Sequence, residues 1–345
     1  MIYIIKRKYL TCPSIVGLFI ASIALSSSMG ISMSEGAGIS SPKLAVGKLL
    51  WSDEFQGKAS REPNPLFWTG NIGSYNYDAV TTHSPDLSLL DGSKQGILNI
   101  KTVKINDPSL YSGLCGGGKY CQFKSGEITT RNLLIFKYGY IEARIKMPTG
   151  EGNWSAFWML PDGNYVPNNQ KPGEIDIVEW YAHYPNKSWS TLHFEAAGAS
   201  ASPSAQPSPA PSALASASIT PNAISQSSTS IGTNGVSASR LSDGFHTYGI
   251  AWLPDSITFY LDGNALATYS ATQITTWPFN NFFYLILNGG VGPQPNTIFG
   301  GTWDGWQQST MSVDWVRDWQ LNGYGQISKK TIPAMTPAQM LAQLK

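Results

Sequence analysis

The hydrophobic positions along the chain fall into many short segments of β type. Turn residues (Gly, Pro, Asn and Asp) separate these segments, and no long stretch repeats with a helical period. This pattern is typical of an all-β sandwich or barrel. The clearest segments cover residues 140–147, 156–160, 174–180, 245–252, 257–261, 282–287 and 311–319.

The N-terminus has the pattern of a secretory signal peptide over residues 1–30. Positive charge at 6–8 precedes an apolar core at 14–25, and small residues follow at 26–30. About a dozen apolar residues are too few to span a bilayer, which needs roughly 20. The alternative is an uncleaved N-terminal anchor. We expect a secreted protein, extracellular or periplasmic, with no membrane contact after cleavage.

The rest of the chain divides by composition. Residues 31–47 form a flexible lead-in, and 48–320 form one domain. Within it, residues 196–239 are mostly Ala, Ser, Pro, Thr and Gly, with no aromatic or charged residue. Such a segment buries too little apolar surface to order itself, which predicts a disordered insertion. The tail, 321–345, carries a capping-box pattern at 336–339 that predicts a short helix.

Charge and cysteine content narrow the partners. Charged residues make up 13% of the chain and the net charge is +1, which argues against nucleic acid as a partner. Cys12 lies in the predicted signal peptide. Cys115 and Cys121 could form a disulfide in an oxidising compartment, or they could be reduced thiols in a flexible loop.

Three carboxylates lie close together in an otherwise apolar, β-branched stretch. Glu174, Asp176 and Glu179 occur within six residues. Carboxylates in a buried strand are costly to desolvate, so a use for them is expected. Hydrolysis of a glycosidic bond needs two such groups, one nucleophile and one proton donor. The alternative is a solvated acidic edge or a calcium site.

A regular strand would place Glu179 on the face opposite to Glu174 and Asp176. A β-bulge at 177–178 would return Glu179 to their face and send Ile175 and one of the two bulge residues into the core. The carboxyl groups could then approach the roughly 5–5.5 Å that allows direct attack with retention of configuration. Mutual repulsion should raise one pKa and leave a protonated acid beside an ionised nucleophile.

The stretch Glu-Ile-Asp-Ile-Val-Glu at 174–179 resembles the signature of family-16 glycoside hydrolases, in the bulged form of laminarinase-like members. The resemblance spans roughly residues 48–320 and implies a concanavalin-like β-jelly-roll sandwich of two antiparallel sheets with a concave substrate cleft. Further similar stretches are residues 50–55, 138–144, 153–160, 245–248, 252–262 and 313–317.

Carried over by position, Glu174 would be the nucleophile, Glu179 the acid/base and Asp176 an assisting carboxylate. Three further residues resemble substrate contacts, each with a structural alternative. Trp154 and Trp158 would line the cleft or pack in the core, and His193 would contact substrate or the acid/base, or be structural.

Two more expectations concern residues outside this stretch. The strand 140–147 alternates between apolar and charged side chains, so Arg144 either lies on a solvated outer face or lines the cleft and binds sugar hydroxyls. No cofactor is expected to be required. The resemblance implies a structural calcium ion held by Glu54, Asp314 and a backbone carbonyl near Gly96.

The expected function is that of a secreted, monomeric, retaining endo-β-glucanase acting on β-1,3-glucan, including mixed β-1,3/1,4-glucan. Residues 71–90, 168–172 and 288–292 depart from the family's pattern at the cleft ends, which leaves the polysaccharide open. The alternatives are a galactan-type substrate, transfer of the glycosyl group to another sugar, or a glucan-binding protein without catalysis. The presence of both Glu174 and Glu179 opposes the last.

Overall fold

The computed structural model describes residues 44–71, 80–107, 115, 121–163, 173–194, 230–274, 276–292 and 301–329. All belong to the unit formed by residues 41–345. The predicted signal peptide, most of the lead-in and the predicted C-terminal helix lie outside the described residues and stay predictions. In the described part of the chain, no helix is long and apolar enough to cross a membrane.

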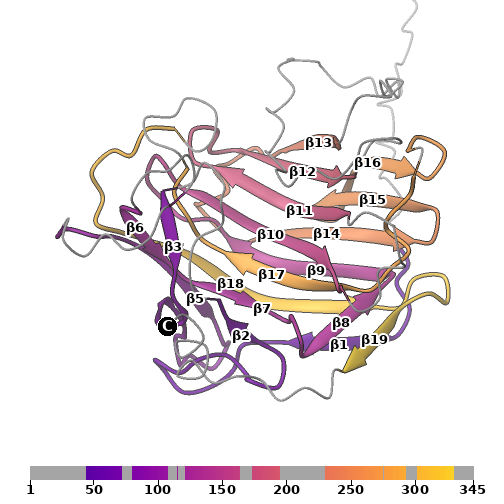
Figure 1. Ribbon diagram of the computed structural model, residues 1–345, viewed down its shortest axis with the longest axis horizontal. Helices are drawn as coiled ribbons and strands as arrows, with labels where there is room; N and C mark the ends of the chain where they lie inside the picture. The colour runs from indigo at the N-terminus through magenta and orange to yellow at the C-terminus, as the bar shows by residue number, and fades with distance from the viewer. Residues whose placement is uncertain are drawn as a thin grey trace, which may run out of the picture. The chain divides into compact units, whose positions relative to one another are not determined.

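Strands from distant parts of the sequence form a ten-stranded sheet, here called sheet A (Figure 1). Its pairings are antiparallel except between β3 (Thr81–His83) and β6 (Phe123–Ser125). Along its path, the order is β16 (Asn264–Ser270), β15 (Ser256–Leu261), β14 (His246–Leu253), β9 (Gly139–Lys146), β18 (Gln308–Trp319), β5 (Leu98–Lys104), β6 (Phe123–Ser125) and β3 (Thr81–His83). Off this path, β1 (Leu49–Asp53) pairs with β18, and β4 (Ser88–Leu90), which follows the 3-10 turn η1 (Pro85–Leu87), pairs with β5.

Nine antiparallel strands form the second sheet, sheet B. Along its main path, the order is β13 (Ser230–Val236), β12 (Lys187–His193), β11 (Glu174–Tyr181), β10 (Trp154–Pro161), β17 (Phe283–Asn288), β7 (Glu127–Thr129) and β2 (Thr69–Gly70). Off this path, β8 (Leu134–Lys137) joins β17 to β19 (Gln326–Lys329).

The core lies between the inner faces of the two sheets. The predicted alternation on β9 is confirmed: Ile141, Ala143 and Ile145 are buried there, with side chains from β11 in the same hydrophobic cluster. Full burial of an isoleucine side chain contributes about 1.5–3 kcal/mol, so this shared core stabilises the packing of the two sheets. These stacked sheets are the predicted β-jelly-roll sandwich.

One predicted boundary is wrong. The last part of the expected insertion, residues 230–236, forms strand β13, which pairs with β12 along its whole length. An edge strand is held by backbone hydrogen bonds and needs few apolar side chains, so its Ser, Thr and Gly content concealed it. Ile231 packs against the core. Residues 195–229 lie outside the described residues.

Candidate active site

Strand β11 carries the predicted bulge. Against β12, Asp176 pairs with Thr191 and Glu179 pairs with Trp189, so Ile177 and Val178 together oppose Ser190. The pairing with β10 shifts at the same place. The Ser190 hydroxyl donates a hydrogen bond of 2.8 Å to the carbonyl oxygen of Ile177, which stabilises the distorted backbone.

The bulge sorts the side chains of β11 onto two faces. The core cluster contains Ile175, Ile177, Val178 and Trp180. The prediction that only one of the two bulge residues enters the core is therefore wrong, because both are buried. Two consecutive core-facing residues restore the later part of the strand to its original register. Glu174, Asp176 and Glu179 therefore share the outer face of sheet B.

Next to this row, His193 holds Asp176. Its Nε2 atom lies 3.0 Å from Asp176 Oδ2, and His193 pairs across the strands with Glu174. Glu174, Asp176 and His193 each offer one atom within 4.8 Å of the others, a spacing that could also hold a metal ion.

The charges of this cluster are strongly coupled. Burial lowers the pKa of His193, but its hydrogen bond to Asp176 and the surrounding carboxylates outweigh burial and raise it to about 9. His193 is therefore an imidazolium at neutral pH, and its positive charge balances one carboxylate.

Both glutamates bind protons more tightly than in water. Burial raises the pKa of Glu174 well above its usual value, and the charge of Asp176 raises it further, while His193 opposes both effects. Burial and the charge of Asp176 also raise the pKa of Glu179, to about 7.

Glu179 is fixed by two donors on one oxygen. The indole Nε1 of Trp154 donates to Oε1 at 3.0 Å, and the hydroxyl of Tyr181 donates to the same oxygen at 2.9 Å. Trp154 comes from β10, where Ala156 pairs with Glu179. The predicted cleft residue Trp154 thus contacts the predicted acid/base directly.

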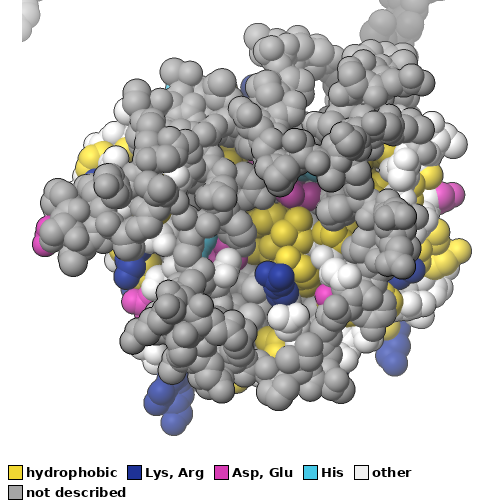
Figure 2. Space-filling model, viewed as in Figure 1, with side chains coloured by type: hydrophobic (Ala, Val, Ile, Leu, Met, Phe, Trp, Pro, Cys, Tyr) yellow, Lys and Arg dark blue, Asp and Glu magenta, His cyan; other side chains and the backbone are white. Residues whose placement is uncertain are grey.

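Beside the carboxylates, the outer face of sheet B is largely apolar. A second hydrophobic cluster joins Trp158 to Ala156, Tyr284, Ile286 and Ile135. The Nε1 atom of Trp158 donates to Asn288 Oδ1 at 2.8 Å, which fixes the ring. Figure 2 shows this face, with a central patch of hydrophobic side chains and acidic side chains beside it. Trp158 belongs to this outer cluster and not to the core between the sheets.

Arg144 is not part of this site. It lies on β9 of sheet A and points away from the core, where its guanidinium binds Asp314 and stacks on Phe245 at 4.6 Å. The interpretation in which Arg144 lines the cleft is therefore wrong, and the solvated outer face is the one that the structure shows. Alternation defined the face of the strand but not which sheet would contain it.

The predicted calcium ligands lie near this outer face of sheet A. Arg317 binds both carboxylate oxygens of Glu54, at 2.9 and 2.8 Å. Asp314 binds Arg144 and accepts a hydrogen bond of 3.0 Å from Gln95. Gly96 lies against the backbone of Glu54, where a Cβ would be 2.3 Å from its carbonyl oxygen. Since arginines engage both carboxylates, the arrangement does not fit two free anionic ligands for a calcium ion.

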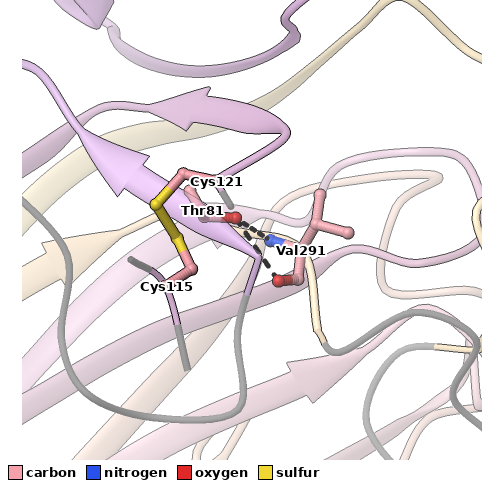
Figure 3. Close-up of a disulfide and its surroundings, with 4 residues drawn as sticks. All are labelled: Thr81, Cys115, Cys121 and Val291. Atoms are coloured by element: carbon pink, nitrogen blue, oxygen red, sulfur yellow. Dashed lines mark hydrogen bonds between the residues drawn. A yellow bond between two sulfur atoms is a disulfide. The ribbon is translucent and has the colours of Figure 1, made fainter. Parts of the chain in front are cut away.

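Cys115 and Cys121 form a disulfide near Thr81 and Val291 (Figure 3). Beside it, Thr81 Oγ1 accepts a hydrogen bond of 2.8 Å from the Val291 amide and donates one of 3.3 Å to its carbonyl. The neighbouring Gly290 carbonyl accepts a hydrogen bond from the Trp154 amide. The disulfide thus lies in the region that supports the start of β10.

Sequence reasoning missed several polar residues of this face. Tyr181 could have been found, because it lies two residues after Glu179 on the same strand. A second polar cluster, around Glu127 on β7, could not have been found from the sequence. Glu127 is fully buried, and His83 Nδ1 lies 3.1 Å from its Oε2 atom. Asn71 Nδ2 donates a hydrogen bond of 2.9 Å to its Oε1 atom. These three residues come together only through long-range strand pairing.

Comparison with known proteins agrees with this geometry. The family model described as "Beta-porphyranase A-D, GH16 domain" matches residues 49–321. A glucan endo-1,3-beta-glucosidase A1 from Niallia circulans is 28% identical over 300 residues, covering 80% of this chain and 38% of that protein. A beta-glucanase from Rhodothermus marinus is 26% identical over 292 residues, covering 78% and 84%. The X-ray structure of an endo-beta-1,3-glucanase from Pyrococcus furiosus superposes with a TM-score of 0.58 at 26% identity, covering 79% and 94%.

Proposed function

Because the chain belongs to glycoside hydrolase family 16, we propose that it hydrolyses β-1,3-linked glucan, including mixed β-1,3/1,4-glucan, within the polymer and with retention at the anomeric carbon. The observation that carries the proposal is the bulge of β11, which gathers Glu174, Asp176 and Glu179 on one face. Relatives named as glucanases support the glucan as substrate.

In the first step, Glu174 attacks the anomeric carbon while Glu179 gives its proton to the glycosidic oxygen. The bond to the leaving sugar breaks, and an ester between Glu174 and the remaining sugar forms. In the second step, Glu179 takes a proton from water, whose oxygen displaces Glu174 from the anomeric carbon. Two inversions give net retention, and both glutamates return to their starting state.

Asp176 and His193 prepare the nucleophile. For attack, Glu174 must be ionised, with Asp176 as the assisting carboxylate next to it on β11. The imidazolium of His193 favours the negative charge of the pair and lowers the pKa of Glu174.

A galactan-type polysaccharide is the second candidate substrate. Its support is the description of the matching family model, which names β-porphyranases. The carboxylate chemistry is the same for both substrates, and the segments at the cleft ends would decide between them.

Product analysis by NMR tests the proposal. The protein would be incubated with laminarin, mixed-linkage glucan, agarose and porphyran, with Glu174→Gln as control. We expect early release of β-anomeric oligosaccharides from laminarin. Release of α-anomers would overturn retention, and products from agarose or porphyran alone would select the galactan-type substrate.

We further propose that the protein is secreted and acts as a monomer. The signal-peptide pattern of residues 1–30 supports secretion, and the disulfide between Cys115 and Cys121 suits an oxidising compartment. N-terminal sequencing of the protein recovered outside the cytoplasm and light scattering of that material would check both points.

A further inference from the structure

We propose that Tyr181 is a positioning residue for the acid/base: with Trp154 it occupies Oε1 of Glu179 and so directs the catalytic proton to Oε2. The proposal rests on the proposed function, because it assumes that Glu179 is the proton donor. It adds a residue, and a chemical reason for the orientation of the carboxyl group.

The backbone places Tyr181 where it can do this. Tyr181 follows Glu179 by two residues beyond the bulge, so both side chains rise from the same face of β11. Its ring is buried, with 4% exposure, and packs against Trp154 and Trp189 at centroid distances of 5.8 and 4.8 Å. A ring packed on two sides cannot swing its hydroxyl away from Glu179 without displacing a tryptophan.

The hydrogen bonds then assign the proton to one oxygen. An indole N–H is only a donor, so the oxygen that it contacts must offer a lone pair. Trp154 and Tyr181 both donate to Oε1, and an oxygen with two lone pairs that accepts two hydrogen bonds has none left for a proton. In the protonated acid, Oε1 is therefore the carbonyl oxygen, and the proton lies on Oε2. Catalysis gains because the carboxyl group need not rotate before it protonates the leaving group.

The same contacts tune the acidity of Glu179. Burial and the charge of Asp176 raise its pKa, whereas the hydrogen bonds from Tyr181 and Trp154 lower it, and the balance lies at about 7. Removing the tyrosine hydroxyl removes a stabilising contact to the carboxylate. The pKa of Glu179 should then rise, and the free carboxyl group should lose its fixed orientation.

The first test needs no substrate. Carboxyl ¹³C NMR titration of protein labelled at glutamate, with the Glu179 signal assigned by its loss in Glu179→Gln, gives this pKa directly. We expect Tyr181→Phe to raise it by about half a unit to one unit. The matched control is Tyr184→Phe, because Tyr184 also packs against Trp189, at 5.2 Å, but is 36% exposed. An unchanged pKa in Tyr181→Phe, or an equal shift in Tyr184→Phe, would overturn the proposal.

Kinetics provide the second test. On laminarin, we expect Tyr181→Phe to lower kcat by about tenfold with little change in KM and to move the alkaline limb of kcat/KM upward. On a dinitrophenyl β-laminaribioside, whose leaving group departs without a proton, formation of the glycosyl-enzyme should slow less than twofold. Equal losses on both substrates would indicate a merely structural role. Trp154→Phe, which removes the other donor, should show the same contrast if Tyr181→Phe folds poorly.

A separate control distinguishes failure of the proposal from failure of the proposed function. In Glu179→Ala, azide should replace the missing base and form a β-glycosyl azide from the dinitrophenyl substrate. If azide restores turnover while Tyr181→Phe behaves as wild type, only the role of Tyr181 is wrong. If azide has no effect, the assignment of Glu179 itself fails.

Discussion

His193 Nε2 lies 3.0 Å from Asp176 Oδ2, at the centre of a site with three carboxyl groups. Burial alone would lower the pKa of this histidine and favour its neutral form. Its contact with Asp176 and the charges of the glutamates outweigh burial and raise the pKa to about 9. The positive charge is thus created by the carboxylates that it stabilises. This reciprocity makes His193 part of the charge balance that lets Glu174 ionise.

Replacing His193 by Ala should therefore alter the pH dependence of catalysis and not only its rate. The imidazolium lowers the pKa of both Glu174 and Glu179, so its loss raises both. Attack requires ionised Glu174, and we expect the acid limb of kcat/KM to move to higher pH by about one unit. The pH–rate profile on laminarin measures this shift. His246→Ala, which removes a histidine paired with Asp262 on sheet A, should leave the profile unchanged.

Replacing Glu174 by Gln should remove hydrolysis while leaving the fold and polysaccharide binding intact. The amide keeps the shape of the side chain but cannot form the ester, so we expect a loss of roughly 10⁴-fold or more in kcat. Reducing-sugar release and affinity electrophoresis would measure activity and binding. Glu142→Gln, on the outer face of sheet A, is the control and should retain activity. Substantial turnover by Glu174→Gln would contradict the nucleophile assignment.

Features that depend on residues close together in the sequence, such as the bulge of β11 and the faces of its side chains, could be predicted. The bulge followed from the five-residue separation of Glu174 and Glu179 together with the period of a strand. The same period places Tyr181, two residues after Glu179, on the face of the carboxylates, so its position was also predictable. For His193, the family resemblance predicted a contact with substrate or the acid/base, and the structure places it against Asp176. No local pattern joins residues so far apart in the sequence.

The errors arose where long-range strand pairing decides. Arg144 lies on the expected polar face of β9, but pairing with β14 and β18 places that face on the sheet opposite the carboxylates. The buried contact of His83 with Glu127 depends on strands from two sheets. Strand β13 was missed because its hydrogen bonds to β12 hold a segment whose side chains indicate disorder.

This correction changes what a deletion should do. Removing residues 199–226 and joining the ends with a short Gly-Ser linker should change the melting temperature by less than about 2 °C, since their composition offers little apolar surface to the core. Removing 196–239 should destabilise the protein much more. It deletes β13 and leaves the backbone of β12 without its hydrogen-bond partners. Differential scanning calorimetry of both variants would measure the contrast, and equal melting temperatures would contradict a structural role of β13.

Asp318 should limit the stability of the sandwich. Its side chain is fully buried, neither oxygen has a hydrogen-bond partner among the described residues, and burial raises its pKa well above the usual value. The folded state therefore favours the neutral acid, whereas the unfolded chain ionises near pH 4. The resulting penalty is absent below the unfolded pKa and grows as the pH rises toward the folded pKa.

We expect Asp318→Val to raise the free energy of unfolding at pH 7 by about 1–3 kcal/mol, with a smaller gain at pH 4. Urea unfolding at both pH values would measure it. Asp318→Asn keeps the shape of the side chain without a group that titrates. The difference in free energy of unfolding between Asp318→Val and Asp318→Asn should therefore not change with pH. An unchanged or lower stability of Asp318→Val at pH 7 would show that the carboxyl group is satisfied in the folded protein.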